Sequence, residues 1–187
     1  FLLNEPVNFY KGNVRLVGEG ALSREDSWVG WAFDNNMYPT DYASKAVNSW
    51  RNELMGCTII VPKNSKAFVY TKSVTEPVYI SHLSFVAKEG RTVGNTIAID
   101  FRSEFWGPTW DFRVEHCHFH GFNKCMNFQA ENQYCVAFVD VSYNAFNQND
   151  EIIYFGETSN DPAKWGVTGS RNMTWGLTFT HNRCHDN

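Results

Sequence analysis

The sequence predicts an all-β fold, a right-handed parallel β-helix with one short flanking helix and loop insertions. Two observations predict it: a six-residue pattern that recurs along the chain, and short alternating segments between the copies. Each copy opens on an apolar residue, passes through a break that is mostly polar, and then alternates apolar and polar residues. A strand, a bend and a second strand repeated in this way are typical of a solenoid. The four copies are residues 80–85, 114–119, 138–143 and 179–184.

The strand that leads into the second copy shows how the core is expected to form. Asp111 and Arg113 alternate with Phe112 and Val114, so the charged residues should face solvent and the apolar ones the core. Similar segments lie before the first and third copies, and Tyr79 in the first is also predicted to face outward. A third strand in each repeat completes a turn of three short strands. The strands that lead into the copies are expected at 77–80, 110–114 and 134–138, and the third strands at 96–101, 126–128 and 151–155.

The N-terminal quarter departs from the repeat. Residues 12–20 predict a strand that ends in a glycine-rich turn. Ser23 stands where the third glycine of a dinucleotide-binding fingerprint belongs, so nucleotide binding is not predicted. Residues 40–56 predict the one helix, because a capping residue precedes an apolar stripe at helical spacing. We expect residues 1–187 to form a single β-helix segment in which 21–56 is a helix-containing insertion.

The composition excludes several classes of protein. A net charge of −4 without any basic run argues against a general nucleic-acid binder. No apolar stretch reaches the roughly 18 residues of a membrane-spanning helix, so membrane insertion is not expected. Five cysteines without framework spacing favour reduced thiols over disulfides. The chain begins inside a strand-like segment and stops directly after a repeat, which indicates a fragment of a longer chain.

One position of the repeat, directly after the bend, carries polar side chains that are expected to stack in a column at strand spacing. Three histidines in a column suggest metal binding, but a bend also needs polar side chains that satisfy backbone groups. Rings stacked about 4.8 Å apart do not form a tetrahedral zinc site without further ligands, so we expect no metal and no other cofactor. The column as aligned contains His82, His116, Asp140 and His181.

The entry strand Asn-Val-Arg-Leu-Val-Gly-Glu-Gly, repeats of the type Ile-Ser-His-Leu-Ser-Phe and the polar bend column resemble the pectate-lyase-like superfamily of β-helices. Within it the chain is most similar to bacteriophage tailspike proteins and capsule depolymerases, over most of residues 7–187. The resemblance implies a homotrimer in the virion tail that acts at the bacterial cell surface. It also implies binding of a bacterial surface polysaccharide and its cleavage by hydrolysis or β-elimination. The family has no fixed catalytic motif, so no residue inherits a role.

Sugar polymers are bound by exposed aromatic rings together with charged and amide side chains. The insertion at 102–110 concentrates such residues, including Trp106 and Trp110, and Arg113 follows it directly. A second insertion, 156–173, adds Trp165. The alternative is that these tryptophans only cover the faces of the solenoid. We predict a sugar-binding groove at the first insertion.

The catalytic residues depend on the chemistry, which the sequence leaves open. Hydrolysis needs two carboxylates, about 5 to 5.5 Å apart for retention or about 6.5 to 9.5 Å for inversion. Glu104 and Asp111 flank the aromatic insertion and are the first choice, with Glu115 in reserve. The other candidate carboxylates are Asp140, Asp150 and Glu151. Elimination needs a base and a cation, for which Arg113 with His118 or Tyr79 on the same outward face is suitable.

Two other functions share the predicted fold. One is a non-catalytic attachment segment of a tail fibre, which binds a host glycan but lacks a working carboxylate pair. The other is a structural shaft that only transmits force or trimerises. Measurements of glycan binding and of cleavage products distinguish these from a depolymerase.

Overall fold

The computed structural model describes residues 1–10, 12–18, 57–70, 77–91, 94–103, 109–130, 135–157, 173–185 and 187. Within them the fold is all-β, and every strand pairing is parallel. The predicted helix at 40–56 lies outside the described residues. In the part of the chain that is described, no helix is long and apolar enough to cross a membrane.

The strands form three five-stranded sheets, which we call sheets I, II and III. Sheet I contains β2 (Val14–Val17), β5 (Val78–Ser81), β8 (Thr109–Glu115), β11 (Cys135–Ser142) and β14 (Met173–Thr180). Sheet II contains β3 (Thr58–Val61), β6 (Ser84–Ala87), β9 (His118–His120), β12 (Ala145–Asn147) and β15 (Arg183–His185). Sheet III contains β1 (Val7–Phe9), β4 (Lys66–Tyr70), β7 (Ile97–Ser103), β10 (Lys124–Ala130) and β13 (Glu151–Glu157).

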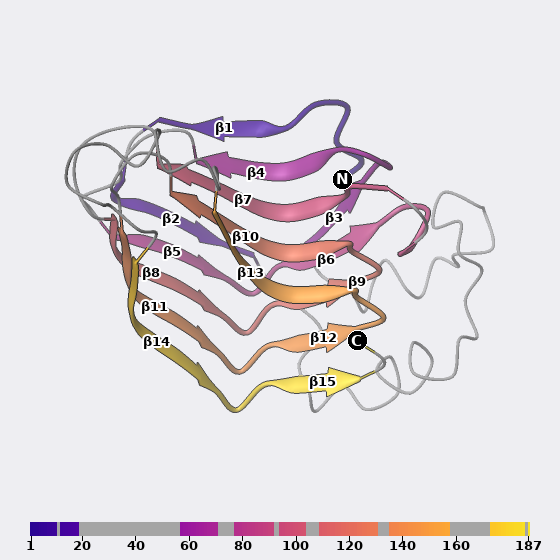
Figure 1. Ribbon diagram of the computed structural model, residues 1–187. Helices are drawn as coiled ribbons and strands as arrows, with labels where there is room; N and C mark the ends of the chain where they lie inside the picture. The colour runs from indigo at the N-terminus through magenta and orange to yellow at the C-terminus, as the bar shows by residue number, and fades with distance from the viewer. Residues whose placement is uncertain are drawn as a thin grey trace.

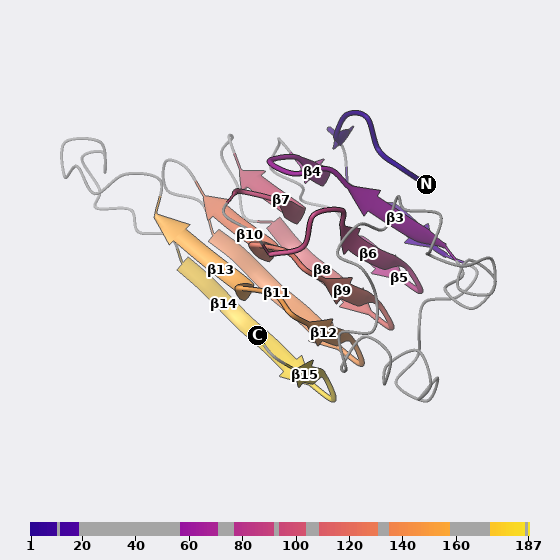
Figure 2. The same ribbon diagram turned by 90° about the vertical axis from the view of Figure 1, so that its right-hand side faces the viewer.

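The chain visits the three sheets in turn and then returns to the first. Each strand therefore pairs with the strand three places along the chain, as in the order β2, β5, β8, β11 and β14 (Figure 1). Seen from the side, the strands of each sheet lie in parallel rows (Figure 2). This arrangement is compatible with a parallel β-helix.

The core lies between the three sheets and is rich in aromatic rings. Phe119 is fully buried and stacks between Phe85 and Phe146, with ring centroids 5.0 and 5.1 Å away. Phe112 and Val114 of β8 are also fully buried. Arg113 between them is exposed, so the predicted alternation is confirmed for these three residues.

The third copy of the sequence repeat was aligned three residues too early. In the sheet I register, Val141 and not Phe138 lies beside Val114. Phe138 has a left-handed backbone, with φ of 56°, and its side chain is 54% exposed. A residue in that conformation breaks the two-residue alternation, so an apolar side chain that looked like a core position points to solvent.

The corrected register changes the bend column. The residues at the bend between sheets I and II all have a positive φ, between 53° and 57°. Tyr143, not Asp140, occupies the third place. Successive rings stack with centroids 5.0, 5.2 and 4.7 Å apart, in the order His82, His116, Tyr143 and His181.

Asparagines close the bends in the last two repeats. Asn144 accepts a hydrogen bond from the Cys117 backbone N–H at 2.8 Å and donates one to the Val114 carbonyl at 2.8 Å. Asn149 makes the same two kinds of bond at the next bend, with Phe122 N–H and the Phe119 carbonyl. Each asparagine is followed in its column by another, namely Asn182 and Asn187. Hydrogen bonds from side chains thus satisfy backbone groups that no strand pairs.

Candidate functional site

The outer face of sheet I carries a row of polar side chains in register across neighbouring strands. Arg15 of β2 lies beside Tyr79 of β5, which lies beside Arg113 of β8, and Arg113 lies beside Asp140 of β11. Because side chains alternate along a strand, Asp111 was expected on the same side as Arg113, and the two are in contact. We call this region, completed by Glu115, the sheet I face.

Arg113 is the centre of the sheet I face. Its Nε donates a hydrogen bond to Oδ1 of Asp111 at 2.8 Å, and both side chains are largely exposed. This hydrogen bond and the charge of Asp111 raise the pKa of Arg113, and the charges of Asp140 and Glu115 raise it further. The guanidinium is therefore a fixed positive charge within reach of three carboxylates.

Asp140 has an incompletely paired carboxylate. Its Oδ1 is buried and has no hydrogen-bond partner among the described residues. Glu115 lies diagonally across from it, because Glu115 pairs with Ser142 while Asp140 pairs with Arg113. Strands about 4.8 Å apart with a rise of about 3.3 Å per residue place the Cα atoms of this diagonal pair about 8 Å apart.

The opposite end of the row is cationic and aromatic. The Arg15 guanidinium carbon lies 5.1 Å from the centroid of the Tyr79 ring, within the range of a cation–π contact. The sheet I face is therefore polarised. Positive charge and an aromatic ring lie over β2 and β5, and carboxylates lie over β8 and β11.

The structure brings together four of the residues that the sequence predicted for a site, namely Tyr79, Asp111, Arg113 and Glu115. Trp110 is the second residue of β8, but its side chain is not among those described. Three further predicted residues lie outside the described part of the chain. They are Glu104, Trp106 and Trp165.

His118 does not lie on the sheet I face, so its predicted position was wrong. It belongs to β9 in sheet II and is only 3% exposed. The bend at His116 turns the chain into another sheet, and the residues after that bend no longer face the direction of Arg113. Alternation continues across a straight strand but not across such a bend.

Sequence reasoning misplaced one member of the row and missed another. Asp140 was a candidate carboxylate but was assigned to the bend column, because the third copy was misaligned, and Arg15 was not considered. The signal was present in both cases. Aligning Val141 with Val114 places Asp140 beside Arg113, and aligning Leu16 with Ile80 places Arg15 beside Tyr79.

The buried thiols and the histidine column do not form a second chemical centre. Burial raises the pKa of Cys117 to about 12 and that of Cys125 well above its usual range, so both stay protonated at neutral pH. No group of three or more histidine, cysteine, aspartate or glutamate side chains within the described ranges is arranged to hold a metal ion.

Comparison with known proteins gives no match: no family model, no curated protein and no solved structure is similar to this chain. The function is therefore argued from the sheet I face and from the residues that compose it.

Proposed function

We propose that this chain is a right-handed parallel β-helix that binds a bacterial surface polysaccharide on the sheet I face and depolymerises it. The observation that carries the proposal is the row in which Arg15, Tyr79, Arg113 and Asp140 follow one another across four strands. A row of charged and aromatic side chains across strands suits an extended polymer with many hydroxyl groups. Charge-assisted hydrogen bonds from guanidinium and carboxylate groups are the strong contacts available to such a ligand.

The biological setting is proposed from the sequence resemblance to tailspikes. In that setting the chain forms homotrimers in the tail of a virion and meets its polysaccharide at the bacterial cell surface. The polymer would lie across the strands of sheet I. Neither a nucleic acid nor a membrane is required as a partner.

Hydrolysis with inversion is the reaction that the carboxylates support best. Ideal strand geometry places the Cα atoms of the diagonal pair Asp140 and Glu115 about 8 Å apart. Because both side chains project from the same face, we expect their carboxyl groups to lie within the separation of about 6.5 to 9.5 Å that inverting enzymes use. One carboxyl protonates the leaving oxygen, and the other activates a water on the opposite side of the sugar. Asp111 is bound to Arg113 and so acts as a positioning residue for the guanidinium.

Elimination is the second reaction, and the pairing of Tyr79 with Arg113 favours it. The guanidinium would neutralise the carboxylate of a uronic acid. The neighbouring Tyr79 phenolate would remove the adjacent proton and return it to the glycosidic oxygen as the C–O bond breaks, which leaves an unsaturated uronate. A cation and a base on adjacent strands are what this chemistry needs. His118 is not available for it, because it is buried in sheet II.

The test incubates the protein with purified capsule and lipopolysaccharide glycans and records binding, reducing ends and the ultraviolet absorbance of unsaturated uronates. Reducing ends alone indicate hydrolysis, and both signals indicate elimination. Asp140→Asn should abolish hydrolysis and retain binding, whereas Glu5→Gln, an exposed carboxylate near the N-terminus, should change neither. Binding without products supports an attachment segment, and absence of binding to every glycan contradicts the proposal.

A further inference from the structure

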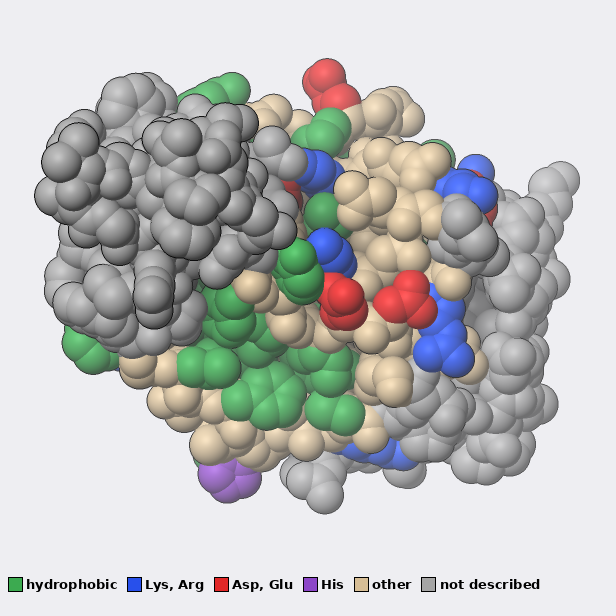
Figure 3. Space-filling model, in the orientation of Figure 1, with side chains coloured by type: hydrophobic (Ala, Val, Ile, Leu, Met, Phe, Trp, Pro, Cys, Tyr) green, Lys and Arg blue, Asp and Glu red, His purple; other side chains and the backbone are tan. Residues whose placement is uncertain are grey.

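The outer face of sheet III carries a second polar group of residues, separate from the sheet I face. We call it the sheet III cluster and define it as Lys66, Asp100, Lys124, Asn127 and Tyr154. Asp100, Asn127 and Tyr154 occupy one row across β7, β10 and β13. In the orientation of Figure 1, acidic and basic side chains gather over this sheet, with a hydrophobic patch below them (Figure 3).

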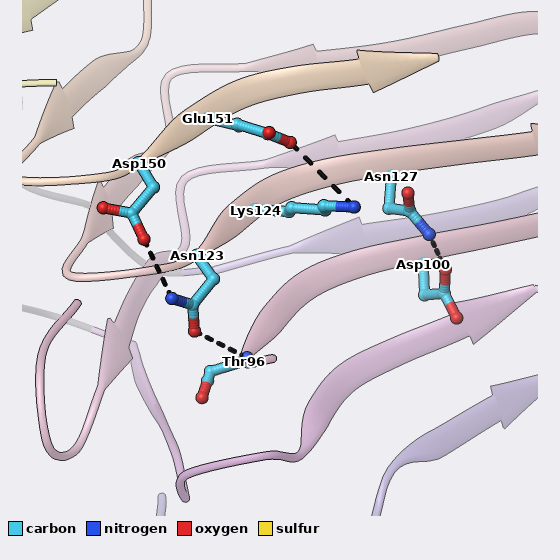
Figure 4. A network of polar contacts seen from close by, with 7 residues as sticks. All are labelled: Thr96, Asp100, Asn123, Lys124, Asn127, Asp150 and Glu151. Carbon is cyan, nitrogen blue, oxygen red and sulfur yellow. Dashed lines mark hydrogen bonds and ion pairs between the residues drawn. The ribbon is translucent and has the colours of Figure 1, made fainter. Parts of the chain in front are cut away.

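A buried carboxylate fixes the geometry of the cluster. The Asp100 side chain has no exposed surface and forms an ion pair with Lys66. It also accepts a hydrogen bond of 2.5 Å from Nδ2 of Asn127 (Figure 4). Because a buried charge requires a paired cation and further hydrogen bonds, this arrangement holds the Asn127 amide in one orientation. The amide nitrogen faces Asp100, and the amide oxygen faces away from it.

The amide oxygen that faces away from Asp100 is an unused acceptor (Figure 4). Asn127 is only 2% exposed, and its Oδ1 has no hydrogen-bond partner among the described residues. Buried polar side-chain atoms nearly always have a partner, and each exception calls for a specific explanation, such as an absent water or ligand. What Oδ1 lacks is a donor, an O–H or N–H group, on the side away from Asp100 (Figure 4).

A donor without a strong acceptor lies on the same strand. The Lys124 ammonium is 3.6 Å from the centroid of the Tyr154 ring and 4.0 Å from the nearest Glu151 oxygen, which is longer than a hydrogen bond (Figure 4). The side chain is partly exposed and can move to meet a ligand. Asn127 and Lys124 thus offer one acceptor and one cationic donor on the same face.

We propose that the sheet III cluster binds a vicinal diol of a sugar. One hydroxyl donates to Oδ1 of Asn127, and its neighbour accepts from Nζ of Lys124 after that ammonium leaves the Tyr154 ring. A fully ionised anion has no hydrogen to give Oδ1, and the buried Asp100 carboxylate repels it. A simple cation is disfavoured by Lys66 and Lys124. A diol supplies both a donor and an acceptor, so it satisfies the two groups together.

The test is nitrogen–proton correlation NMR of the intact chain, titrated with the methyl glycosides of glucose, galactose and mannose, and with inorganic phosphate. The side-chain amide signals of Asn127, assigned by their loss in Asn127→Ala, should shift saturably with at least one glycoside and not with phosphate. Lys124→Met should weaken that binding at least tenfold. Lys88→Met, a partly exposed lysine elsewhere, should leave it unchanged.

Two results would overturn the proposal. One is the absence of a saturable shift with every glycoside, which would mean that a trapped water alone satisfies Oδ1. The other is a shift that persists unchanged in Lys124→Met; should that variant not fold, Lys124→Gln takes its place. Because the reporter lies on sheet III and the probes are monosaccharides, the result does not depend on whether the sheet I face binds a polysaccharide.

Discussion

The ring of Tyr143 stacks on the ring of His116, with the two centroids 5.2 Å apart and the planes inclined by 13°. Both residues have a left-handed backbone, which costs an L-amino acid roughly 1 to 2 kcal/mol. They lie at the same bend in neighbouring repeats, so each ring covers the next along the column. The stacking offsets part of the backbone cost and keeps the bends of successive repeats in register.

Replacing Tyr143 should therefore reveal the contribution of the ring column. Tyr143→Ala removes the contacts with His116 and His181 and should lower the free energy of unfolding by about 1 to 3 kcal/mol, at about 0.5 to 1.5 kcal/mol per ring pair. Tyr143→His, which restores the residue type of the other bends, should lose less than about 1 kcal/mol. Urea unfolding measures both. Equal stability of the two variants would show that the stacked rings do not contribute to the free energy of unfolding.

Truncating a ring in the aromatic row of sheet II should lower the free energy of unfolding more than truncating Tyr143. Phe119 is fully buried between two other rings, so Phe119→Ala should cost roughly 3 to 5 kcal/mol. Phe138→Ala is the matched control, because the same change at a side chain that is 54% exposed should cost less than about 1 kcal/mol. Comparable losses in thermal or urea unfolding would contradict the assignment of the two faces.

The strand pattern was predictable where the backbone is regular. In β8 the backbone is extended after Asp111, which is itself left-handed with φ of 59°. Alternation over residues 112–114 correctly placed Phe112 and Val114 inside and Arg113 outside, since side chains of an extended segment alternate strictly. It failed at Phe138, because a left-handed residue resets the alternation and apolar character alone does not reveal it. His116 has the same left-handed conformation, and the bend there turns the chain away from the sheet I face. His118, which follows the bend, therefore does not lie on the face to which it had been assigned.

The candidate site could be predicted where it depends on alternation within one strand, but not where it depends on the register between repeats. Tyr79 and Arg113 were placed on one face by alternation within strands, and Glu115 was predicted to face outward at the bend. Asp140 required the correct register between repeats, which a variable insertion length obscures. The asparagine columns had a visible signal, because Asn144 and Asn149 have the same five-residue spacing as Asn182 and Asn187.

Two glycines allow the destabilisation caused by backbone strain to be distinguished from that caused by a steric contact. Gly90 and Gly176 both have a positive φ, 69° and 68°, so an alanine at either should cost roughly 1 to 2 kcal/mol. A Cβ at Gly90 would meet nothing within 4 Å, whereas one at Gly176 would lie 3.1 Å from Cδ1 of Phe138. Gly176→Ala should therefore be the more destabilising in urea unfolding. A smaller loss than for Gly90→Ala would mean that the Phe138 ring yields without cost.

The asparagine column makes a prediction about hydrogen bonds rather than packing. Asn144→Ala leaves the Cys117 N–H and the Val114 carbonyl without their partner inside the protein. Each unsatisfied buried group costs about 1 to 3 kcal/mol, so the variant should lose about 2 to 6 kcal/mol. Asn8→Ala removes an exposed asparagine that bonds only the Pro6 carbonyl, and it should lose less than about 0.5 kcal/mol. Equal midpoints in chemical unfolding would argue against the column as a structural element.

The buried thiol of Cys117 predicts a fall in stability at alkaline pH. Burial raises its pKa from 9.0 to about 12, so between these values the unfolded chain releases a proton that the folded chain retains. Deprotonation then favours the unfolded chain, and stability contributed below pH 9.0 is lost as the pH rises toward about 12. The free energy of unfolding should begin to decline near pH 9, and Cys117→Ala should reduce the slope without abolishing it, because burial also raises the pKa of Cys125.

The measurement is urea unfolding at a series of pH values between about 8 and 10, a window that ends where ordinary tyrosines begin to titrate. The absolute stability of Cys117→Ala does not matter, because a cavity lowers it equally at every pH. Only the slope against pH carries the effect of the thiol. Parallel slopes for the wild type and Cys117→Ala would mean that Cys117 ionises equally well in both states, and thus that the bend between sheets I and II admits water beside it.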